Sequence, residues 1–342
     1  MALFLIVLAV SVFMTQMAQA CSRVFWNTHI EQVIVGRSMD WQHTFDDWMF
    51  VFPRGQLMTG GEVNDPAKWV SKYGSVVTAV SGYAEKQGFD WVKDGATDGI
   101  NEKGLSAHLL FLESSKYPDR DGRPAISYMR WVRYLLDNYA TVEEAVVGMK
   151  KVRIEALMFG DEKLGLHVAI EDPSGDSAIF EFVEGQLKID HGKKYKVMTN
   201  DPIYAKQIEN LKQYRDFGGE KGIPGETVSE DRFVRASYYL NYLPKPKNSS
   251  EAAASMHSLI MNVAVPFGAP YGGGVYPTWW TTIIDLTNKV YYFNWVQNTN
   301  VIWLELENFD FSVGKPILQL NPRLPSLVGE VSSHFETVKS AM

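Results

Sequence analysis

The residue with the clearest chemical potential is Cys21, the only cysteine among 342 residues. It follows Ala18-Gln19-Ala20, a small-residue pattern typical of the site at which a signal peptide is cut. After such a cut, Cys21 would carry both a thiol and a free α-amine. An α-amine titrates near ~7.7–8.0 and can accept the thiol proton. These two groups predict a nucleophile at the mature N-terminus that needs no histidine as its base.

Arg37 and Asp40 are candidate partners of this nucleophile. They lie at the end of the second of two short apolar segments, Arg23–Trp26 and Gln32–Val35, which predict a hairpin. The hairpin returns that end of the chain to Cys21. A guanidinium near the sulfur favours the thiolate, and a carboxylate near the amine orients it and stabilises its protonated form. The alternative is an ordinary Arg–Asp surface pair beside a turn.

The first 20 residues predict an export signal. They carry no charged side chain, contain one apolar run and end on small residues. A membrane-spanning helix needs ~20 consecutive apolar residues, whereas Thr15, Gln16 and Gln19 interrupt this run. We therefore expect a signal peptide over residues 1–20, cleaved after Ala20. The mature protein should be periplasmic or secreted, without a stable membrane anchor.

The composition is that of an ordinary globular protein. The formal net charge is −7 and 46% of the residues are hydrophobic, which is enough for a sizeable core. A nucleic-acid partner would require a basic patch, so none is expected. No linker, repeat or charge run marks a boundary, and residues 21–342 should form a single domain. The seven histidines show no ligand spacing, so neither a metal nor a cofactor is predicted.

Blocks of predicted strands alternate with blocks of predicted helices, which favours an α+β layered fold over βαβ alternation. Further strands are expected over Trp48–Phe52, Ser75–Val80, Leu105–Leu110, Leu166–Ile170, Ala178–Val183, Lys196–Thr199, Trp279–Asp285, Val290–Trp295 and Val301–Leu306. Helices are expected over Ala125–Asn138, Val142–Lys151, Ile203–Arg215, Asp231–Leu243 and Glu251–Val263. Thr141 and Glu144 form a capping box for the second of these helices.

Five motifs, in this order along the chain, resemble those of the choloylglycine hydrolase family, which includes bile salt hydrolases and penicillin V acylases. They are Cys21, Gly36-Arg37-x-x-Asp40, Asn101-Glu102-Lys103-Gly104-Leu105, Met198-Thr199-Asn200-Asp201-Pro202 and Asp231-Arg232-Phe233-Val234-Arg235. The resemblance covers most of the mature chain. Together with the export signal, the pattern is most similar to the Gram-negative branch of the family.

The resemblance implies the αββα four-layer sandwich of N-terminal-nucleophile (Ntn) hydrolases, formed by one catalytic domain. It implies hydrolysis of a non-peptide amide C–N bond through a thioester on Cys21, with Arg37 and Asp40 tuning the thiol and the amine. Asn200 would donate a hydrogen bond to the tetrahedral oxyanion, a contribution of roughly 3 kcal/mol. Arg232 would hold the local polar network. The family also implies a homo-oligomer such as a tetramer.

The chain departs from the family near the active site. Many members place an Asn or Tyr about ten residues after the first Asn of the third motif, where this chain has Phe111. Phe111 cannot donate a hydrogen bond, so a second oxyanion donor must come from a backbone N–H or from elsewhere. With Trp41 and Phe45, on a predicted loop, it is a candidate substrate-binding residue. The candidate substrates are N-acylated small molecules: penicillin V, an acyl-homoserine lactone or a conjugated bile acid.

Two other functions would use Cys21 differently. A lipid-modified Cys21 would make the chain a periplasmic binding protein anchored to a membrane, although Ala18-Gln19-Ala20 lacks the Leu usual before a lipidated cysteine. A papain-like protease would need a catalytic histidine and a local signature that Ser22-Arg23-Val24 does not provide. Hydrolysis of N-acyl amides therefore remains the principal hypothesis.

Overall fold

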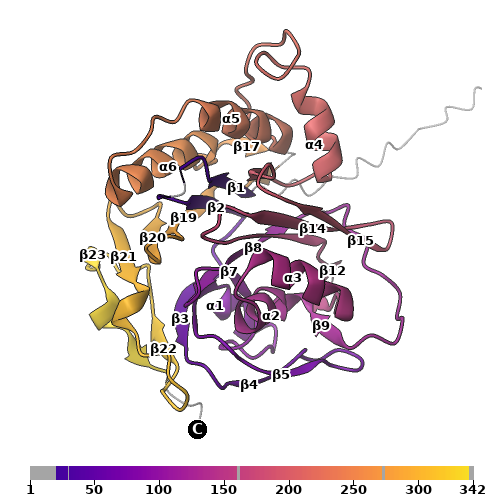
Figure 1. Ribbon diagram of the computed structural model, residues 1–342, viewed down its shortest axis with the longest axis vertical. Helices are drawn as coiled ribbons and strands as arrows, with labels where there is room; N and C mark the ends of the chain where they lie inside the picture. Colours follow the sequence, from indigo (N-terminus) through magenta and orange to yellow (C-terminus); the bar gives the residue numbers. More distant parts are fainter. Residues whose placement is uncertain (1–20, 30, 160–161, 272–273, 339–342) are drawn as a thin grey trace, which may run out of the picture.

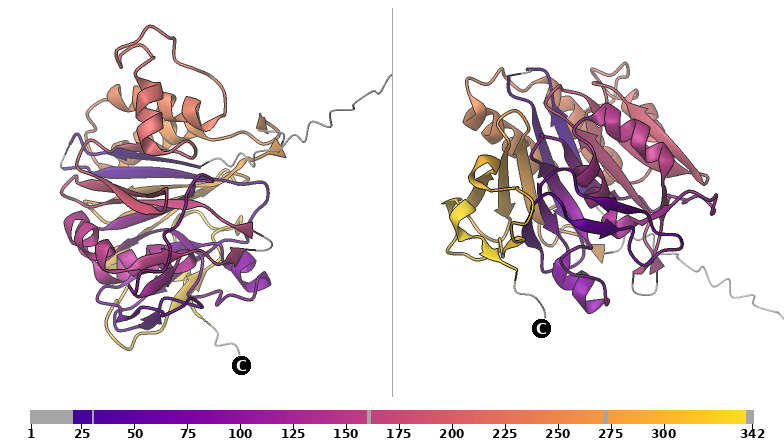
Figure 2. Two further views of the ribbon diagram at one scale, coloured as in Figure 1. Left: turned by 90° about the vertical axis from the view of Figure 1, so that its right-hand side faces the viewer. Right: turned by 60° about the horizontal axis from the view of Figure 1, so that its bottom comes forward.

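Two stacked β-sheets with helices on both outer sides make up the part of the chain described by the computed structural model, residues 21–29, 31–159, 162–271 and 274–338 (Figures 1 and 2). The predicted signal peptide lies outside these residues. The first sheet contains, in spatial order, β16 (Val197–Met198), β1 (Cys21–Trp26), β2 (Ile34–Asp40), β19 (Thr278–Asp285), β20 (Val290–Trp295), β21 (Val301–Glu305) and β23 (Gly329–Glu330).

The second sheet is the larger one and is antiparallel between the strands paired in it. It contains, in spatial order, β15 (Gln186–His191), β14 (Ser177–Val183), β13 (Leu166–Glu171), β8 (Ser106–Phe111), β7 (Ala96–Asn101), β6 (Ser75–Ala79), β3 (Trp48–Phe52), β22 (Leu318–Leu320) and β24 (Glu336–Thr337). Shorter ladders join β4 (Leu57–Thr59) to β5 (Lys68–Val70), β9 (Ala125–Ser127) to β10 (Arg153–Glu155), β11 (Met158–Phe159) to β12 (Glu162–Lys163), and β17 (Pro270–Tyr271) to β18 (Gly274–Val275).

The helices cover the two outer sides of this pair of sheets. Helices α5 and α6 pack on β1, β2 and β19 of the first sheet, and α2 and α3 pack on the second sheet (Figure 1). The result is the four-layer αββα sandwich that the sequence predicts. The helices are α1 (Ser81–Lys86), α2 (Trp131–Asn138), α3 (Val142–Gly148), α4 (Tyr204–Leu211), α5 (Ser229–Asn241) and α6 (Ser249–Val263). None of the helices in the described part of the chain combines the length and apolar character that crossing a membrane requires.

Strands β1 and β2 are buried on both faces because one face meets the second sheet and the other meets α5 and α6. We call these the inner face and the outer face of the first sheet. Gly36 shows how closely α6 approaches: a Cβ at this position would lie 2.6 Å from Ile260 and 2.8 Å from Met256. Because side chains alternate along a strand, Arg37 points inward and Asp40 outward.

The predicted elements are largely present, with shifted ends. Helix α3 begins at the predicted cap, where the Thr141 side chain accepts from the backbone N–H of Glu144 at 3.2 Å. The helix expected over Ala125–Asn138 was wrong in its first part, because Ala125–Ser127 is a buried strand and only Trp131–Asn138 is α-helical. A segment this short shows no periodicity and fits a buried strand as well as a buried helix. The second hairpin strand was placed too early, since β2 extends to Asp40.

Candidate active site

Cys21 opens β1, and its side chain lies on the inner face of the first sheet. It pairs with Met39 of β2 and is 2% exposed. The Cys21 Sγ lies 3.9 Å from Met39 Sδ and 3.8 Å from the carbonyl oxygen of Asp40. The sulfur is thus enclosed in the protein and has little contact with water.

Burial raises the pKa of the Cys21 thiol, because a thiolate would lose its hydration there. The positive charge of Arg37 opposes this effect, as does that of Arg232, whereas the Asp40 carboxylate adds to it. The pKa of the thiol nevertheless lies above its ordinary value. The thiol is therefore protonated at neutral pH, and a base must remove its proton before the sulfur can act as a nucleophile.

Arg37 lies on the same inner face and is fully buried. Its Nη1 donates to the carbonyl oxygen of Thr97 at 3.1 Å, and its Nη2 donates to that of Leu109 at 2.9 Å. The guanidinium also lies over Trp280, 4.7 Å from the ring centroid, and 3.6 Å from Asp98 Oδ2. These contacts fix the cation between the two sheets, from where its charge acts on the sulfur.

A chain of buried charges continues from Arg37 into the second sheet. Asp98 Oδ2 lies 2.6 Å from His108 Nδ1, and His108 Nε2 lies 3.0 Å from Glu171 Oε2. Glu171 forms an ion pair with Arg23 of β1. The side chains of all five residues are fully buried. We call these five residues the interior charge network, and it includes Arg37 through its contact with Asp98.

Asp40 lies on the outer face, beneath α5. Its Oδ1 accepts from Thr278 Oγ1 at 2.5 Å, and its Oδ2 accepts from Ser38 Oγ at 3.2 Å. Arg232 Nη1 lies 4.0 Å from the same Oδ2. Burial raises the pKa of Asp40 to about 6, although Arg232 and the two hydroxyl donors lower it in part. Asp40 therefore changes charge close to neutral pH, unlike an exposed aspartate.

Arg232 donates hydrogen bonds to several groups around the backbone of Cys21. Its Nη1 donates to the Cys21 carbonyl oxygen at 2.6 Å and to Ser22 Oγ at 2.7 Å, and its Nη2 donates to Asn200 Oδ1 at 2.9 Å. The same Asn200 oxygen accepts from the backbone nitrogen of Cys21 at 2.5 Å. The nitrogen that would become the α-amine is thus fixed by Asn200, and Asn200 is fixed by Arg232.

The amide nitrogen of Asn200 has its own partner. Asn200 Nδ2 donates to the carbonyl oxygen of Phe111 at 2.7 Å. An amide NH₂ group carries two hydrogens, so one N–H is used on Phe111 and the second can serve another acceptor. The predicted role of Asn200 as oxyanion donor rests on that second N–H and stays a prediction.

Trp41, Phe45 and Phe111, the three predicted substrate-binding residues, line one pocket together with Cys21. The Trp41 ring centroid lies 5.1 Å from that of Phe45 and 5.9 Å from that of Phe111. The pocket has a volume of about 50 Å³, and its remaining walls are mostly apolar side chains such as Met129. A narrow, apolar pocket in front of a thiol suits an aryl or acyl group better than a polar one.

The structure thus brings together all the predicted site residues, but on two faces of one sheet. Three hydroxyl residues of the outer face were missed: Ser22, Ser38 and Thr278. Ser38 lies inside the Gly36-Arg37-x-x-Asp40 motif and faces the same side as Asp40, so strand periodicity could have identified it. Thr278 is 238 residues away from Asp40 along the chain, and no local sequence signal connects the two.

No metal centre is visible in the described part of the chain, where no group of three or more His, Cys, Asp or Glu side chains could hold an ion. The expectation that the protein binds no metal, which rests on the spacing of its seven histidines, therefore stays a prediction for the whole protein. The partners found around Cys21 are side chains and backbone carbonyls of the chain itself.

The sequence matches known proteins over most of its length. The family model described as linear amide C–N hydrolases, choloylglycine hydrolase family, matches residues 21–319. A penicillin V acylase of Pectobacterium atrosepticum is 34% identical over 348 residues, covering 93% of this chain and 90% of the relative. A bile salt hydrolase/transferase of Clostridium perfringens is 25% identical and covers 81% of this chain and 90% of the relative.

Solved structures of similar proteins also cover most of this chain. The penicillin V acylase from Agrobacterium tumefaciens superposes with a TM-score of 0.82 at 37% identity, covering 93% of this chain and 98% of that chain. A mutant of the conjugated bile acid hydrolase from Clostridium perfringens superposes with a TM-score of 0.73 at 22% identity, covering 88% of this chain and 96% of that one. At that identity, the second likeness concerns the fold alone.

Proposed function

The chain belongs to the choloylglycine hydrolase family of linear amide C–N hydrolases, and on that premise we propose that it hydrolyses N-acylated small molecules through a thioester on Cys21. The observation that carries this proposal is the placement of the two reactive atoms of Cys21. Its sulfur faces an apolar pocket beside Arg37, while its nitrogen is bound by Asn200 and its carbonyl oxygen by Arg232. In the uncut chain this nitrogen belongs to a peptide bond, so removal of residues 1–20 would create the base.

The α-amine supplies the base that the raised thiol pKa requires. It takes the proton from the sulfur, and the thiolate attacks the carbonyl carbon of the substrate amide. The tetrahedral intermediate expels the amine product, which receives the proton from the α-ammonium group. Water, deprotonated by the same amine, then attacks the thioester, and the acid product leaves with Cys21 restored. Asp40 stabilises the ammonium state through the hydroxyl and guanidinium network of the outer face.

The oxyanion of the tetrahedral intermediate needs donors on the pocket side. The free N–H of Asn200 is the first, and its orientation is set by the three bonds made by the rest of that amide, to Phe111, Arg232 and Cys21. Phe111 contributes only its carbonyl oxygen to this arrangement, so the second donor is proposed to be a backbone N–H. Each preorganised donor contributes roughly 3 kcal/mol to the stabilisation of the transition state.

Among the candidate substrates, penicillin V fits best. The two relatives at 34% and 37% identity are both named penicillin V acylases, whereas the bile-acid enzymes are more distant. The pocket of about 50 Å³ is lined by the rings of Trp41, Phe45 and Phe111, which suits a flat aryl group better than a fused steroid. Conjugated bile acids and acyl-homoserine lactones remain the comparison substrates.

Export and activation would then be a single event. We propose that residues 1–20 direct the chain to the periplasm or outside the cell and that cleavage after Ala20 exposes the amine. The intact mass of the purified protein tests this. A mass that begins at an unmodified Cys21 agrees with the proposal, whereas a diacylglycerol adduct on Cys21 would indicate a lipid-anchored binding protein instead.

The proposed mechanism is tested with three mature proteins assayed on penicillin V, an acyl-homoserine lactone and a conjugated bile acid. Cys21→Ala removes the nucleophile, and a chain with one Gly before Cys21 keeps the thiol but lacks the α-amine at the right atom. Both should lose at least about a thousandfold in kcat, as enzymes do when the nucleophile or its base is removed. Ser333→Ala, at an exposed position, serves as the control. Undiminished turnover by the Gly-extended protein would exclude the amine as base.

A further inference from the structure

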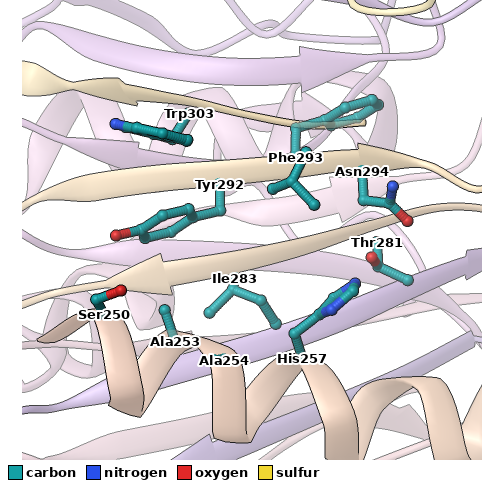
Figure 3. Close-up of a pocket in the computed structure, with 11 residues that line it drawn as sticks. Ser250, Ala253, Ala254, His257, Thr281, Ile283, Tyr292, Phe293, Asn294 and Trp303 are labelled. Atoms are coloured by element: carbon teal, nitrogen blue, oxygen red, sulfur yellow. The ribbon is translucent and has the colours of Figure 1, made fainter. Parts of the chain in front are cut away.

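A second pocket lies on the outer face of the first sheet, between α6 and strands β19, β20 and β21 (Figure 3). Its volume is about 220 Å³, larger than that of the pocket in front of Cys21. The two pockets share no lining residue and lie on opposite faces of the sheet. The proposed hydrolysis therefore leaves this second pocket without a role.

The floor of the second pocket consists of side chains that the strand register aligns in rows across three strands. Thr281, Asn294 and Val301 form one row across the three strands. Ile283, Tyr292 and Trp303 form the next row, with the Tyr292 and Trp303 rings 6.0 Å apart. The helix side is open where α6 presents small residues, including Ala253 and Ala254, toward this floor. A flat molecule can therefore lie between the aromatic row and the helix.

One end of the pocket is polar and incompletely hydrogen-bonded. Figure 3 shows His257, Thr281 and Asn294 gathered at this end. Thr281 is 1% exposed, and neither its Oγ1 nor His257 Nε2 has a hydrogen-bond partner among the described residues. The His257 imidazole does interact with the Asn294 side chain, which leaves Nε2 for a ligand. A buried polar atom without a partner costs free energy, so a ligand that supplies partners would be favoured here. Because burial lowers the pKa of His257, its ring is neutral at pH 7.

The charge of the pocket limits the ligand. None of the described residues that line it is an Asp, Glu, Lys or Arg. A carboxylate or an ammonium group would lose its hydration here without gaining a counter-ion, which is strongly unfavourable. A hydroxyl group, in contrast, both donates and accepts. It can therefore pair with His257 Nε2 in either tautomer and with the Thr281 hydroxyl.

We propose that this pocket is a second binding site, which takes an uncharged molecule with one aromatic ring and a hydroxyl group, of the phenol class. The ring lies over Tyr292 and Trp303, and the hydroxyl reaches His257 and Thr281. The size agrees with this assignment, because an apolar cavity of about 150 Å³ is sufficient to bind benzene. The site needs no contact with Cys21 and is independent of the hydrolytic reaction.

The test measures binding of 4-methylphenol to the mature Cys21→Ala protein by isothermal titration calorimetry, with toluene and 4-methylbenzoate as matched probes. The Cys21→Ala background prevents turnover and separates this test from that of the hydrolytic mechanism. We expect 4-methylphenol to bind at least about fivefold more tightly than toluene, the effect of one net hydrogen bond, and 4-methylbenzoate to bind least. Equal binding of toluene, or tighter binding of 4-methylbenzoate, would overturn the assignment.

Two substitutions locate the bound probe. Ala254→Trp, at an exposed position on the rim, should fill the pocket and weaken 4-methylphenol binding at least tenfold, whereas Asn262→Trp, exposed on the same helix but outside the pocket, should leave it unchanged. Thr281→Val keeps the shape but removes the hydroxyl and should weaken binding about fivefold. If 4-methylphenol binds Ala254→Trp as tightly as the parent protein, it occupies a different site and the proposal is wrong.

Discussion

The two faces of β1 and β2 offer two different environments to a single residue. On the inner face, the sulfur of Cys21 lies among apolar side chains with one cation, Arg37, held between the sheets. On the outer face, Asp40 lies beneath α5 near Arg232 of that helix, and hydroxyl groups contact both residues. The inner face keeps the thiol protonated, and the outer face concentrates charge around the backbone of the same residue.

This difference indicates that the surroundings of the Cys21 sulfur and of the Cys21 backbone nitrogen can be changed separately, although both atoms belong to one residue. A strand places consecutive side chains on opposite faces, so a three-residue spacing sends Arg37 and Asp40 to opposite sides. Arg37 therefore shares the face of the sulfur, whereas the Asp40 carboxylate influences the thiol only by its charge and lies with Arg232 near the backbone of Cys21. The largest effect is expected on the outer face, where Arg232 binds buried groups.

Arg232→Met should have the largest effect. It leaves Asp40 and the Cys21 carbonyl oxygen without their charged partner in a fully buried site, and removing one partner of a buried ion pair costs about 3–5 kcal/mol. We expect that loss in the free energy of unfolding, measured by urea denaturation, together with loss of turnover. Arg123→Met, whose partner Asp121 is exposed, should cost far less, because solvent screens an exposed ion pair. Equal losses in both variants would contradict the ranking.

Asp40→Asn should change the pH dependence of stability. With a pKa of about 6 in the folded protein, Asp40 keeps a proton between about pH 4 and 6 that the unfolded chain has released. The free energy of unfolding contributed by this residue therefore falls as pH rises through that window, by about 3 kcal/mol in total. Asp40→Asn should lack this fall, as measured by denaturation at a series of pH values.

The control for Asp40 is a carboxylate with the opposite shift. Hydrogen bonding to Lys86 lowers the pKa of Asp46, so Asp46 contributes stability above its ordinary pKa and loses it as pH falls. Asp46→Asn should leave the slope between pH 4 and 6 as it is. Burial raises the pKa of Asp47 to about 7, so part of the slope persists in every variant. Superimposable profiles for Asp40→Asn and the parent protein would refute the assignment.

Arg37→Met tests the inner face. The cation opposes the effect of burial on the thiol, so its loss should raise the pKa of Cys21 further and slow alkylation by iodoacetamide at pH 7 about tenfold, the effect of one pKa unit. The pH dependence of the alkylation rate reports the thiol directly and does not require turnover. Arg37→Lys keeps the charge, so its alkylation rate should lie between those of the parent protein and Arg37→Met. An unchanged alkylation profile in Arg37→Met would show that the cation does not act on the sulfur.

The sequence was sufficient to predict the layers of the fold. It missed Ser22, Ser38 and Thr278 around Asp40 and Arg232, and it did not show how the candidate site residues divide between two faces. Motif spacing located Cys21, Arg37 and Asp40 because a hairpin is a local structure. The end of β2 decides which face each side chain meets, and that end depends on pairing with β19, far away in sequence. For the same reason no pattern predicted that Asn200 would bond to Phe111, 89 residues away. Long-range partners require the assembled sheets.

His108→Asn should have a smaller effect, because it acts on the sulfur only through Asp98 and Arg37. Loss of the imidazole between two carboxylates should loosen the interior charge network and slow alkylation of Cys21 at pH 7 by about two- to fourfold, with a lower kcat and an unchanged KM. His167→Asn is the matched control, since His167 is equally buried and pairs with Glu181 at 3.2 Å outside the network. If both variants alter alkylation equally, the effect is general loosening of the core.

Phe111→Tyr should produce the smallest change in the kinetic constants. It tests whether a side-chain hydroxyl on the inner face affects the reaction. The bond from Asn200 is to the backbone oxygen of residue 111, so it survives any side chain at this position. If a backbone N–H is the second oxyanion donor, the new hydroxyl adds nothing to the transition state. It only makes the pocket less apolar, so KM for penicillin V should rise about two- to fivefold while kcat stays constant. Phe111→Leu, which changes shape without polarity, separates the two causes. A rise in kcat of about tenfold in Phe111→Tyr alone would mean that a side-chain hydroxyl on the inner face can stabilise the oxyanion, and that a backbone N–H is not the second donor.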